Sequence, residues 1–153
     1  MLQNFYGPLL NIHSWLRWLV LAAGLLATFV ALSGWSGNKT SNGPLRRFSV
    51  MFVGSMDLQL LLGLVLFFAA SPLTQQALSD MGAAMKVREL RFFVVEHTAL
   101  MLLAVILAHV GAVLAKKGKT VAGQYRGAAV CFALSLSLVL AGIPWWRPLF
   151  RLG

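Results

Sequence analysis

Four apolar stretches, each long enough to cross a lipid bilayer, constrain the fold of this chain more than any other feature. They lie near 9–33, 48–70, 92–115 and 126–146, and a helix needs about 20 such residues to cross about 30 Å of hydrocarbon. Charged residues make up 11% of the chain, whereas a soluble domain carries roughly a quarter. We therefore expect a single transmembrane domain over 1–153, surrounded by lipid.

Short loops join these stretches, so the chain is predicted to run up, down, up and down. This gives an all-α, antiparallel four-helix bundle, in which the first and third spans are parallel and face each other across the diagonal. The second loop is longer, and Ser79 with Asp80 is expected to cap a helix that runs into the third span. Pro144 is expected to end the last helix.

The net charge of +9 does not indicate nucleic-acid binding, because the basic residues lie at the ends of apolar stretches, where lipid head groups lie. One side holds Lys39, Arg46, Arg47, Lys116, Lys117, Lys119 and Arg126, and the other holds Lys86, Arg88, Arg91, Arg147 and Arg151. Basic loops favour the cytoplasm. We expect a multi-pass membrane protein with both termini outside.

Two of the three histidines are predicted to lie at matching depth on parallel helices. His13 lies about four residues inside the first span and His97 about five inside the third, or roughly 6–8 Å from the outer side. Helical periodicity places Arg17 and Ala27 on the face of His13, and Ala108 on the face of His97. Small residues mark helix faces that pack against protein in a membrane, so both histidines are expected to point into the bundle.

A side chain that can ionise or bind a metal is costly in hydrocarbon, and it indicates a functional site. Diagonal helices lie about 11–14 Å apart when neighbours lie 8–10 Å apart, and histidine is a common axial ligand of haem. We interpret His13 and His97 as ligands of one haem b. In the alternative interpretation, His13 is a polar residue at the interface and His97 hydrogen-bonds across the bundle. His109, turned about 120° from His97, is expected to make an interhelical hydrogen bond or reach the interface.

Other polar residues are expected near the histidines. Gln59 shares a face with Ser55 and Gly63 and should face the bundle, whereas Asp57 points about 160° away. Near mid-membrane, Asp57 is expected to pair with a neighbouring subunit, to be protonated or to lie in a second polar groove. Arg17 needs a partner or water at its depth.

Three interpretations of this polar cluster stay open. It forms a structural network, or it clamps the haem propionates with Arg91 or Arg88 at the outer rim and Arg17 inside. In the third interpretation, Glu96 and Asp57 form a proton or quinone site. The second and third are compatible.

Four motifs carry a resemblance to a known family. They are Asn11-Ile12-His13-Ser14-Trp15-Leu16-Arg17-Trp18, Leu58-Gln59-Leu60-Leu61-Leu62-Gly63, Arg91-Phe92-Phe93-Val94-Val95-Glu96-His97 and Gly142-Ile143-Pro144-Trp145. Together they resemble small four-span bacterial membrane proteins, common in Bacteroidetes-type genomes, that are often labelled cytochrome b. The resemblance implies a haem-b-type protein of the bacterial inner membrane with His13 and His97 as candidate ligands. In that family a histidine often stands two residues before the glutamine of the second span, where this chain has Asp57.

These observations predict a haem-b-type electron-transfer protein that exchanges electrons with quinone or a redox partner at the outer face. Arg17, Gln59, Arg91 and Glu96 would form the supporting shell. The protein would be at most a redox component, because we find no nucleophile–base pair and no phosphate-binding loop. The alternative is a non-catalytic accessory subunit of a larger respiratory or photosynthetic membrane complex, with Asp57 in contact with another subunit.

Overall fold

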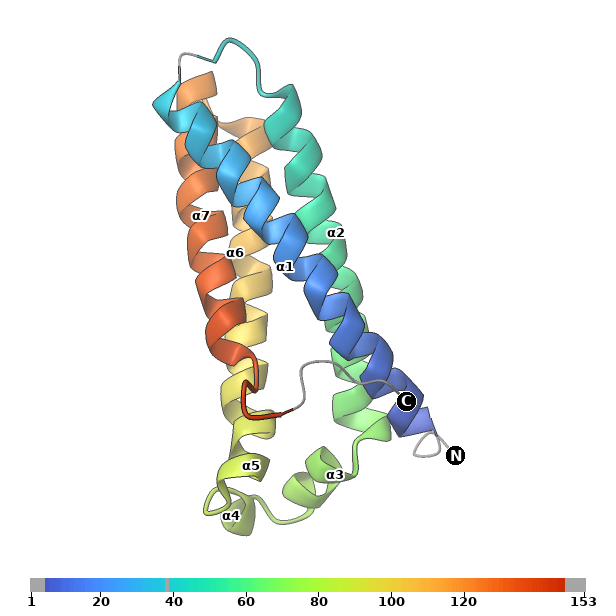
Figure 1. Cartoon of the computed structure of the whole chain (residues 1–153). Helices are drawn as coiled ribbons and strands as arrows, with labels where there is room; N and C mark the ends of the chain where they lie inside the picture. The colour runs from blue at the N-terminus through green and yellow to red at the C-terminus, as the bar shows by residue number, and fades with distance from the viewer. Residues whose placement is uncertain (1–4, 38, 148–153) are drawn as a thin grey trace.

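The computed structural model of the protein describes residues 5–37 and 39–147, which form helices and connecting segments. Four long helices dominate it (Figure 1): α1 (Tyr6–Ser36), α2 (Gly43–Val65), α6 (His97–Lys117) and α7 (Val121–Gly142). A π turn, η2 (Leu66–Ala70), extends α2, and α5 (Arg88–Arg91) with a second π turn, η3 (Phe92–Glu96), leads into α6. Between η2 and α5 lie two short helices, α3 (Pro72–Ser79) and α4 (Met81–Ala84). The predicted all-α fold is confirmed.

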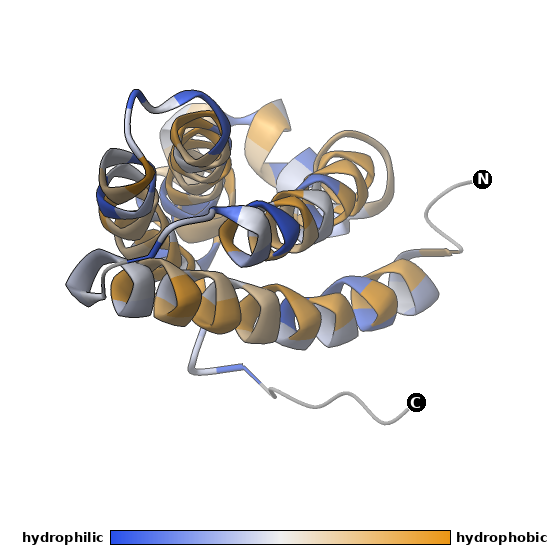
Figure 2. Cartoon of the chain, turned by 90° about the horizontal axis from the view of Figure 1, so that it is seen from above, coloured by the Kyte–Doolittle hydropathy of each residue, from blue (hydrophilic) through white to orange (hydrophobic). Residues whose placement is uncertain are grey.

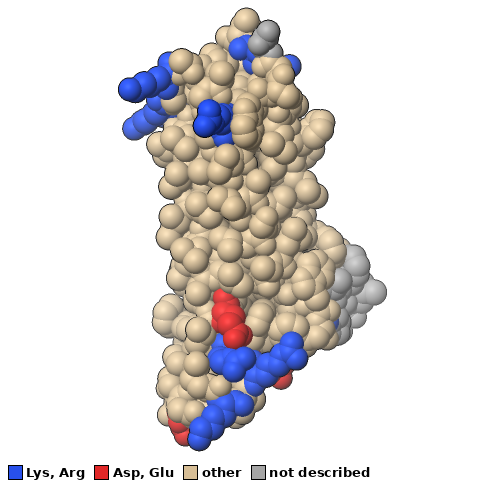
Figure 3. Space-filling model, turned by 90° about the vertical axis from the view of Figure 1, so that its left-hand side faces the viewer, with Lys and Arg blue, Asp and Glu red and all other residues tan. Residues whose placement is uncertain are grey.

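All four predicted spans appear as helices that are long and apolar enough to cross a membrane. They run over Tyr6–Ser36, Gly43–Ala70, Arg88–Lys117 and Val121–Gly142. Seen along the bundle, much of the ribbon is hydrophobic (Figure 2), and many large apolar side chains are exposed, as lipid contact requires. On the face in Figure 3, lysines and arginines gather at the two ends and leave the middle uncharged. The chain is thus a multi-pass membrane protein.

The four spanning helices form a square in which each packs against two neighbours. α1 packs against α2 and α7, and α6 packs against the same two helices. α1 and α6 therefore face each other across the diagonal. This confirms the predicted antiparallel arrangement, and it brings the two helices that carry His13 and His97 to opposite corners.

The bundle is densely packed toward the loops that join α1 to α2 and α6 to α7, and we call this part the packed half. Fully buried alanines line its centre, including Ala27 and Ala31 of α1 and Ala108 of α6. Small residues let helix backbones approach closely in a membrane. The rings of Phe52 and Phe132, whose centroids lie 5.6 Å apart, fill the remaining space.

Toward the other end of the bundle the helices separate, and we call this part the hollow half. α1 crosses the other spans obliquely, so that its C-terminal half lies beside α7 and its N-terminal half leans toward α2 (Figure 1). Most of the buried residues of α1 accordingly lie from Val20 onward. The oblique crossing opens space between α1, α6 and the end of α7.

Two predicted helix boundaries are corrected by the structure. The last helix ends at Gly142 rather than at residue 146, because Ile143, which precedes Pro144, is extended, as residues before proline generally are. The Asp80 side chain caps only the short α4, where it accepts a hydrogen bond of 2.9 Å from the Ala83 amide. The helix that enters the third span begins later, at Arg88.

Candidate functional site

The hollow half encloses a cavity of about 280 Å³ that all four spans help to line. Most of its wall is apolar, with leucines, phenylalanines and valines from α1, η2, η3, α6 and α7. Ligand pockets are typically apolar with a few placed polar groups. Here the charged, imidazole and amide groups are His13, Arg17, Gln59, His97 and Arg147.

The two cavity histidines meet at the centre of the bundle. His13 reaches in from α1 and His97 from the start of α6, and their ring centroids lie 6.4 Å apart with an angle of 67° between the ring planes. Sequence periodicity predicted this inward orientation, which the structure confirms. The structure describes no hydrogen bond between the two rings.

One nitrogen of His97 is held by the backbone of α7. Nδ1 lies 2.8 Å from the carbonyl oxygen of Gly142. Because a carbonyl can only accept, Nδ1 carries the proton, and Nε2 of the neutral ring keeps its lone pair. A backbone carbonyl on the outer nitrogen is the usual way in which proteins orient a metal-binding histidine.

His13 is held mainly through Gln59, which faces the bundle as predicted. The Gln59 amide nitrogen donates to the His13 carbonyl oxygen at 3.0 Å and lies 3.3 Å from His13 Nε2, a weaker contact. Within the described part of the chain, His13 Nδ1 is buried and makes no hydrogen bond. Gly63 of α2 faces the same ring, because a Cβ there would lie 3.5 Å from His13 Cε1.

The spacing of the two rings fits a metal held between them. A metal–imidazole bond is about 2 Å long, so two rings on opposite sides of one ion have centroids roughly 6 Å apart. Among the described residues, no group of three His, Cys, Asp or Glu side chains could hold a metal. The described residues therefore offer at most two such ligands to a metal at this place, His13 and His97.

Arg147 also lines the cavity, and sequence reasoning did not place it in the site. Its guanidinium lies 4.6 Å from the centroid of the Phe93 ring and pairs with Glu89. The residue follows Pro144, where α7 has already ended, so helical periodicity could not assign it a face. Arg17 provides a second cation that lines the cavity, on the His13 face as predicted.

Two residues of the predicted supporting shell lie elsewhere. Arg91 and Glu96 form an ion pair of 2.9 Å on the surface, with side chains 40% and 39% exposed, and neither lines the cavity. Arg88 also lies outside it and stacks over Trp146. The π turn η3 separates Arg91 from His97, and the helical phase inferred from the sequence does not apply across it.

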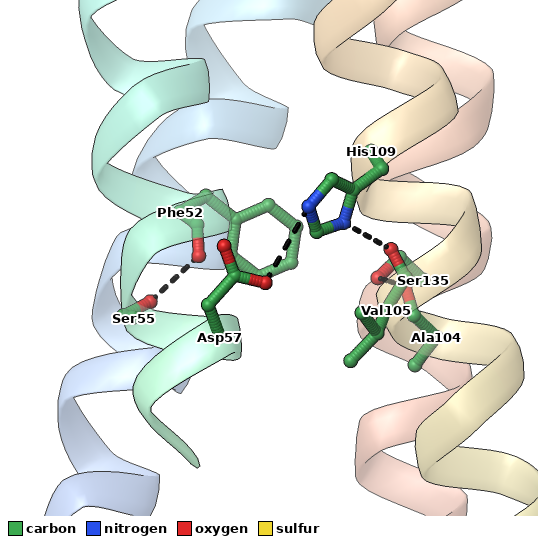
Figure 4. Close-up of polar contacts among 7 residues, drawn as sticks. All are labelled: Phe52, Ser55, Asp57, Ala104, Val105, His109 and Ser135. Carbon is green, nitrogen blue, oxygen red and sulfur yellow. Dashed lines mark hydrogen bonds and ion pairs between the residues drawn. The ribbon is translucent and has the colours of Figure 1, made fainter. Parts of the chain in front are cut away.

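Asp57 is not part of the cavity either. It lies on the far side of α2 from Gln59, as predicted, and it pairs with His109 of α6 at 3.4 Å (Figure 4). Instead of the expected interhelical hydrogen bond, His109 makes this ion-pair contact across to α2, and its hydrogen bond is to the Val105 carbonyl oxygen within α6. A pairing between residues 57 and 109 leaves no mark on the periodicity of either helix.

The site thus combines two convergent imidazoles, an amide, two guanidinium groups and an apolar wall. Such a set can hold a flat, largely apolar cofactor through its metal and its carboxylates, and it contains no nucleophile–base pair within the described residues. No protein-family model, no curated protein and no solved structure matches this chain.

Proposed function

We propose that the protein binds one haem b in the hollow half and transfers single electrons within the membrane. The observation that carries the proposal is the 6.4 Å spacing of the His13 and His97 rings across the bundle diagonal, which suits one metal ion between them. The resemblance of the His13 and Glu96-His97 motifs to small membrane proteins labelled cytochrome b supports the same conclusion.

Different residues of the chain would bind the iron and the carboxylates of the haem. His97 offers Nε2, with its tautomer set by Gly142, and His13 offers Nε2 after release of the long contact to Gln59. Arg17 and Arg147 are the cations on the cavity wall, and guanidinium groups bind carboxylates in pairs of hydrogen bonds. When bound, haem supplies one-electron chemistry, and its axial ligands and surroundings set the potential.

The apolar wall would exclude water and lower the local dielectric, which tunes the potential of a buried metal. Both histidines lie near one end of their spans, because η3 and α5 alone precede His97 in the third. A single centre near one surface cannot carry electrons across the bilayer. The partner is therefore a quinone or a redox protein that reaches the same side.

The decisive experiment is a dithionite-reduced minus oxidised spectrum of the protein purified from haem-replete cells. We expect a haem-b difference signal in the unmodified protein and its loss in both His13→Ala and His97→Ala. His109→Ala is the matched control, because it removes a histidine from the same bundle but outside the cavity, and it should keep the signal. Size-exclusion profiles establish that the variants are folded.

Two results would overturn the proposal. A colourless protein would exclude the haem and favour an accessory subunit of a larger membrane complex. A signal that survives in both cavity variants would place the haem elsewhere in the chain.

A further inference from the structure

A second polar site lies on the outside of the bundle, at the seam between α2 and α6. Asp57 and His109 point toward each other across this seam (Figure 4), with side chains 47% and 48% exposed. Asp57 is ten residues from Arg47 and His109 eight from Lys117, so the pair lies about 12–15 Å inside the basic end of the bundle. That depth is near the middle of the hydrocarbon core.

His109 is oriented toward Asp57 by the backbone of its own helix. His109 Nδ1 lies 3.0 Å from the Val105 carbonyl oxygen, so it donates, and Nε2 faces Asp57 Oδ1. An acidic and a basic group that face each other at mid-membrane cost less than either would alone, because each provides the other with a polar partner.

Both partners keep hydrogen-bonding capacity. Their separation of 3.4 Å exceeds the 2.7–3.2 Å of a good N–H···O bond. A third group that displaces this long contact can therefore accept from the imidazole and donate to the carboxylate. One turn toward the basic end, Gly54 has no atom within 4 Å of the position that a Cβ would occupy, so the surface beside Asp57 is open.

The depth restricts which molecules can reach this seam. Around it, Leu61, Ile106 and Val110 are exposed apolar side chains, and lipid head groups do not extend to mid-membrane. A second copy of the chain could reach this depth only with its own Asp57–His109 pair, because its other described charged side chains, apart from Arg17 in the cavity, lie toward the two ends of the bundle. A lipid-soluble molecule with a small polar head group is the better match.

We infer that the Asp57–His109 pair binds the head group of a membrane quinone or quinol. A quinone carbonyl accepts from the imidazole, a quinol hydroxyl donates to the carboxylate, and the ring lies on the flanking apolar side chains. Binding at this site requires no haem. Val105, whose carbonyl holds His109, also lines the cavity, so the quinone site and the proposed haem site share one turn of α6.

The test is photolabelling of the protein in liposomes with a photoreactive quinone analogue, followed by mass-spectrometric mapping of the label. We expect labels near the pair at Gly54 or Leu61 of α2, or at Ile106 or Val110 of α6, none of which lines the cavity. Excess unlabelled quinone should compete with this labelling. Asp57→Asn and His109→Ala should each weaken labelling about tenfold or more, because each removes a charge-assisted hydrogen bond. Ser137→Ala, on the outer face of α7, is the matched control and should label normally.

Several outcomes would overturn the inference. The first is labelling that excess unlabelled quinone does not reduce. The second is a label on residues that line the cavity, and the third is labelling that Asp57→Asn and His109→Ala both leave unchanged. A disulfide between copies of a Gly54→Cys, Cys131→Ser variant would show that a second copy covers the seam. Competition by unlabelled quinone in the unmodified protein tests the inference even if a variant fails to fold. A protein that is colourless but is labelled at the seam would support the quinone site and contradict the proposed haem.

Discussion

The packed half and the hollow half are built from the same four helices, yet one is solid and the other encloses a cavity. In the packed half, Ala27, Ala31 and Ala108 are fully buried and let the helices approach closely. In the hollow half the inward positions of α1 carry His13 and Arg17 instead. Lipid provides no hydrophobic force that would close such a gap. The cavity therefore begins where the small residues of α1 end.

The largest difference between the two halves is expected when one methyl group is added to each of them and the free energies of unfolding are compared. A Cβ at Gly34 would collide with the Tyr125 ring, which is 2% exposed and fixed by its hydroxyl bond to the Ser41 carbonyl. Gly34→Ala should therefore lower the free energy of unfolding by about 1–3 kcal/mol. SDS titration followed by circular dichroism measures the effect.

Gly63→Ala is the matched change in the hollow half. Its methyl group would make an ordinary contact of 3.5 Å with His13, and alanine favours helix over glycine by about 1 kcal/mol. The stability of this variant should equal or slightly exceed that of the unmodified protein. Equal losses in the two variants would contradict the division into two halves.

A smaller effect is expected from the hydrogen bond that ties α7 to α6. Ser135 is fully buried, and its hydroxyl donates to the Ala104 carbonyl oxygen at 2.7 Å. Such bonds contribute about 0.6 kcal/mol on average and up to about 1.7 kcal/mol in membranes, so Ser135→Ala should destabilise the protein by that amount. Ser137→Ala removes only a bond within α7 and should have no measurable effect. The same SDS titration compares the two, and a larger loss in Ser137→Ala would refute the assignment.

The smallest effect is expected at the surface of the hollow half. The Arg91–Glu96 pair is well exposed, and such pairs contribute about 0.2–1 kcal/mol. Arg91→Gln should therefore cost less than about 1 kcal/mol at low salt and nothing at high salt, because salt screens exposed charges. The haem spectrum expected above should not change. A large change in the haem spectrum of Arg91→Gln would show that this arginine does act on the haem.

Hydrophobic length and loop length were enough to predict the fold. Four apolar stretches with short connections allow only an antiparallel bundle, and this places α1 and α6 on the diagonal. The boundaries were less certain, because they depend on single residues such as Ile143, whose extended backbone ends the last span before Pro144.

The site was predictable only where helical phase is regular. His13, His97, Arg17 and Gln59 were assigned to the interior from the positions of small residues on the same faces, and they line the cavity. Arg147 lies beyond the last helix, and the pairing of Asp57 with His109 depends on how α2 and α6 are aligned along their axes. Neither the face of a residue after a helix end nor the relative height of two helices is encoded in periodicity.

The π turn η3 has a consequence for how the third span could change. Each residue of an α-helix advances the chain by about 100°, and η3 contains one wide turn between Arg91 and His97. This wide turn takes up one extra residue locally, so the helical segments on its two sides keep their relative direction. Deleting a single residue there would therefore restore a regular helix, and Arg88–Arg91 would keep their direction relative to His97. The pairing of Glu89 with Arg147 would also be kept. Loss of one codon would thus straighten the entry to α6 without disturbing the centre of the site.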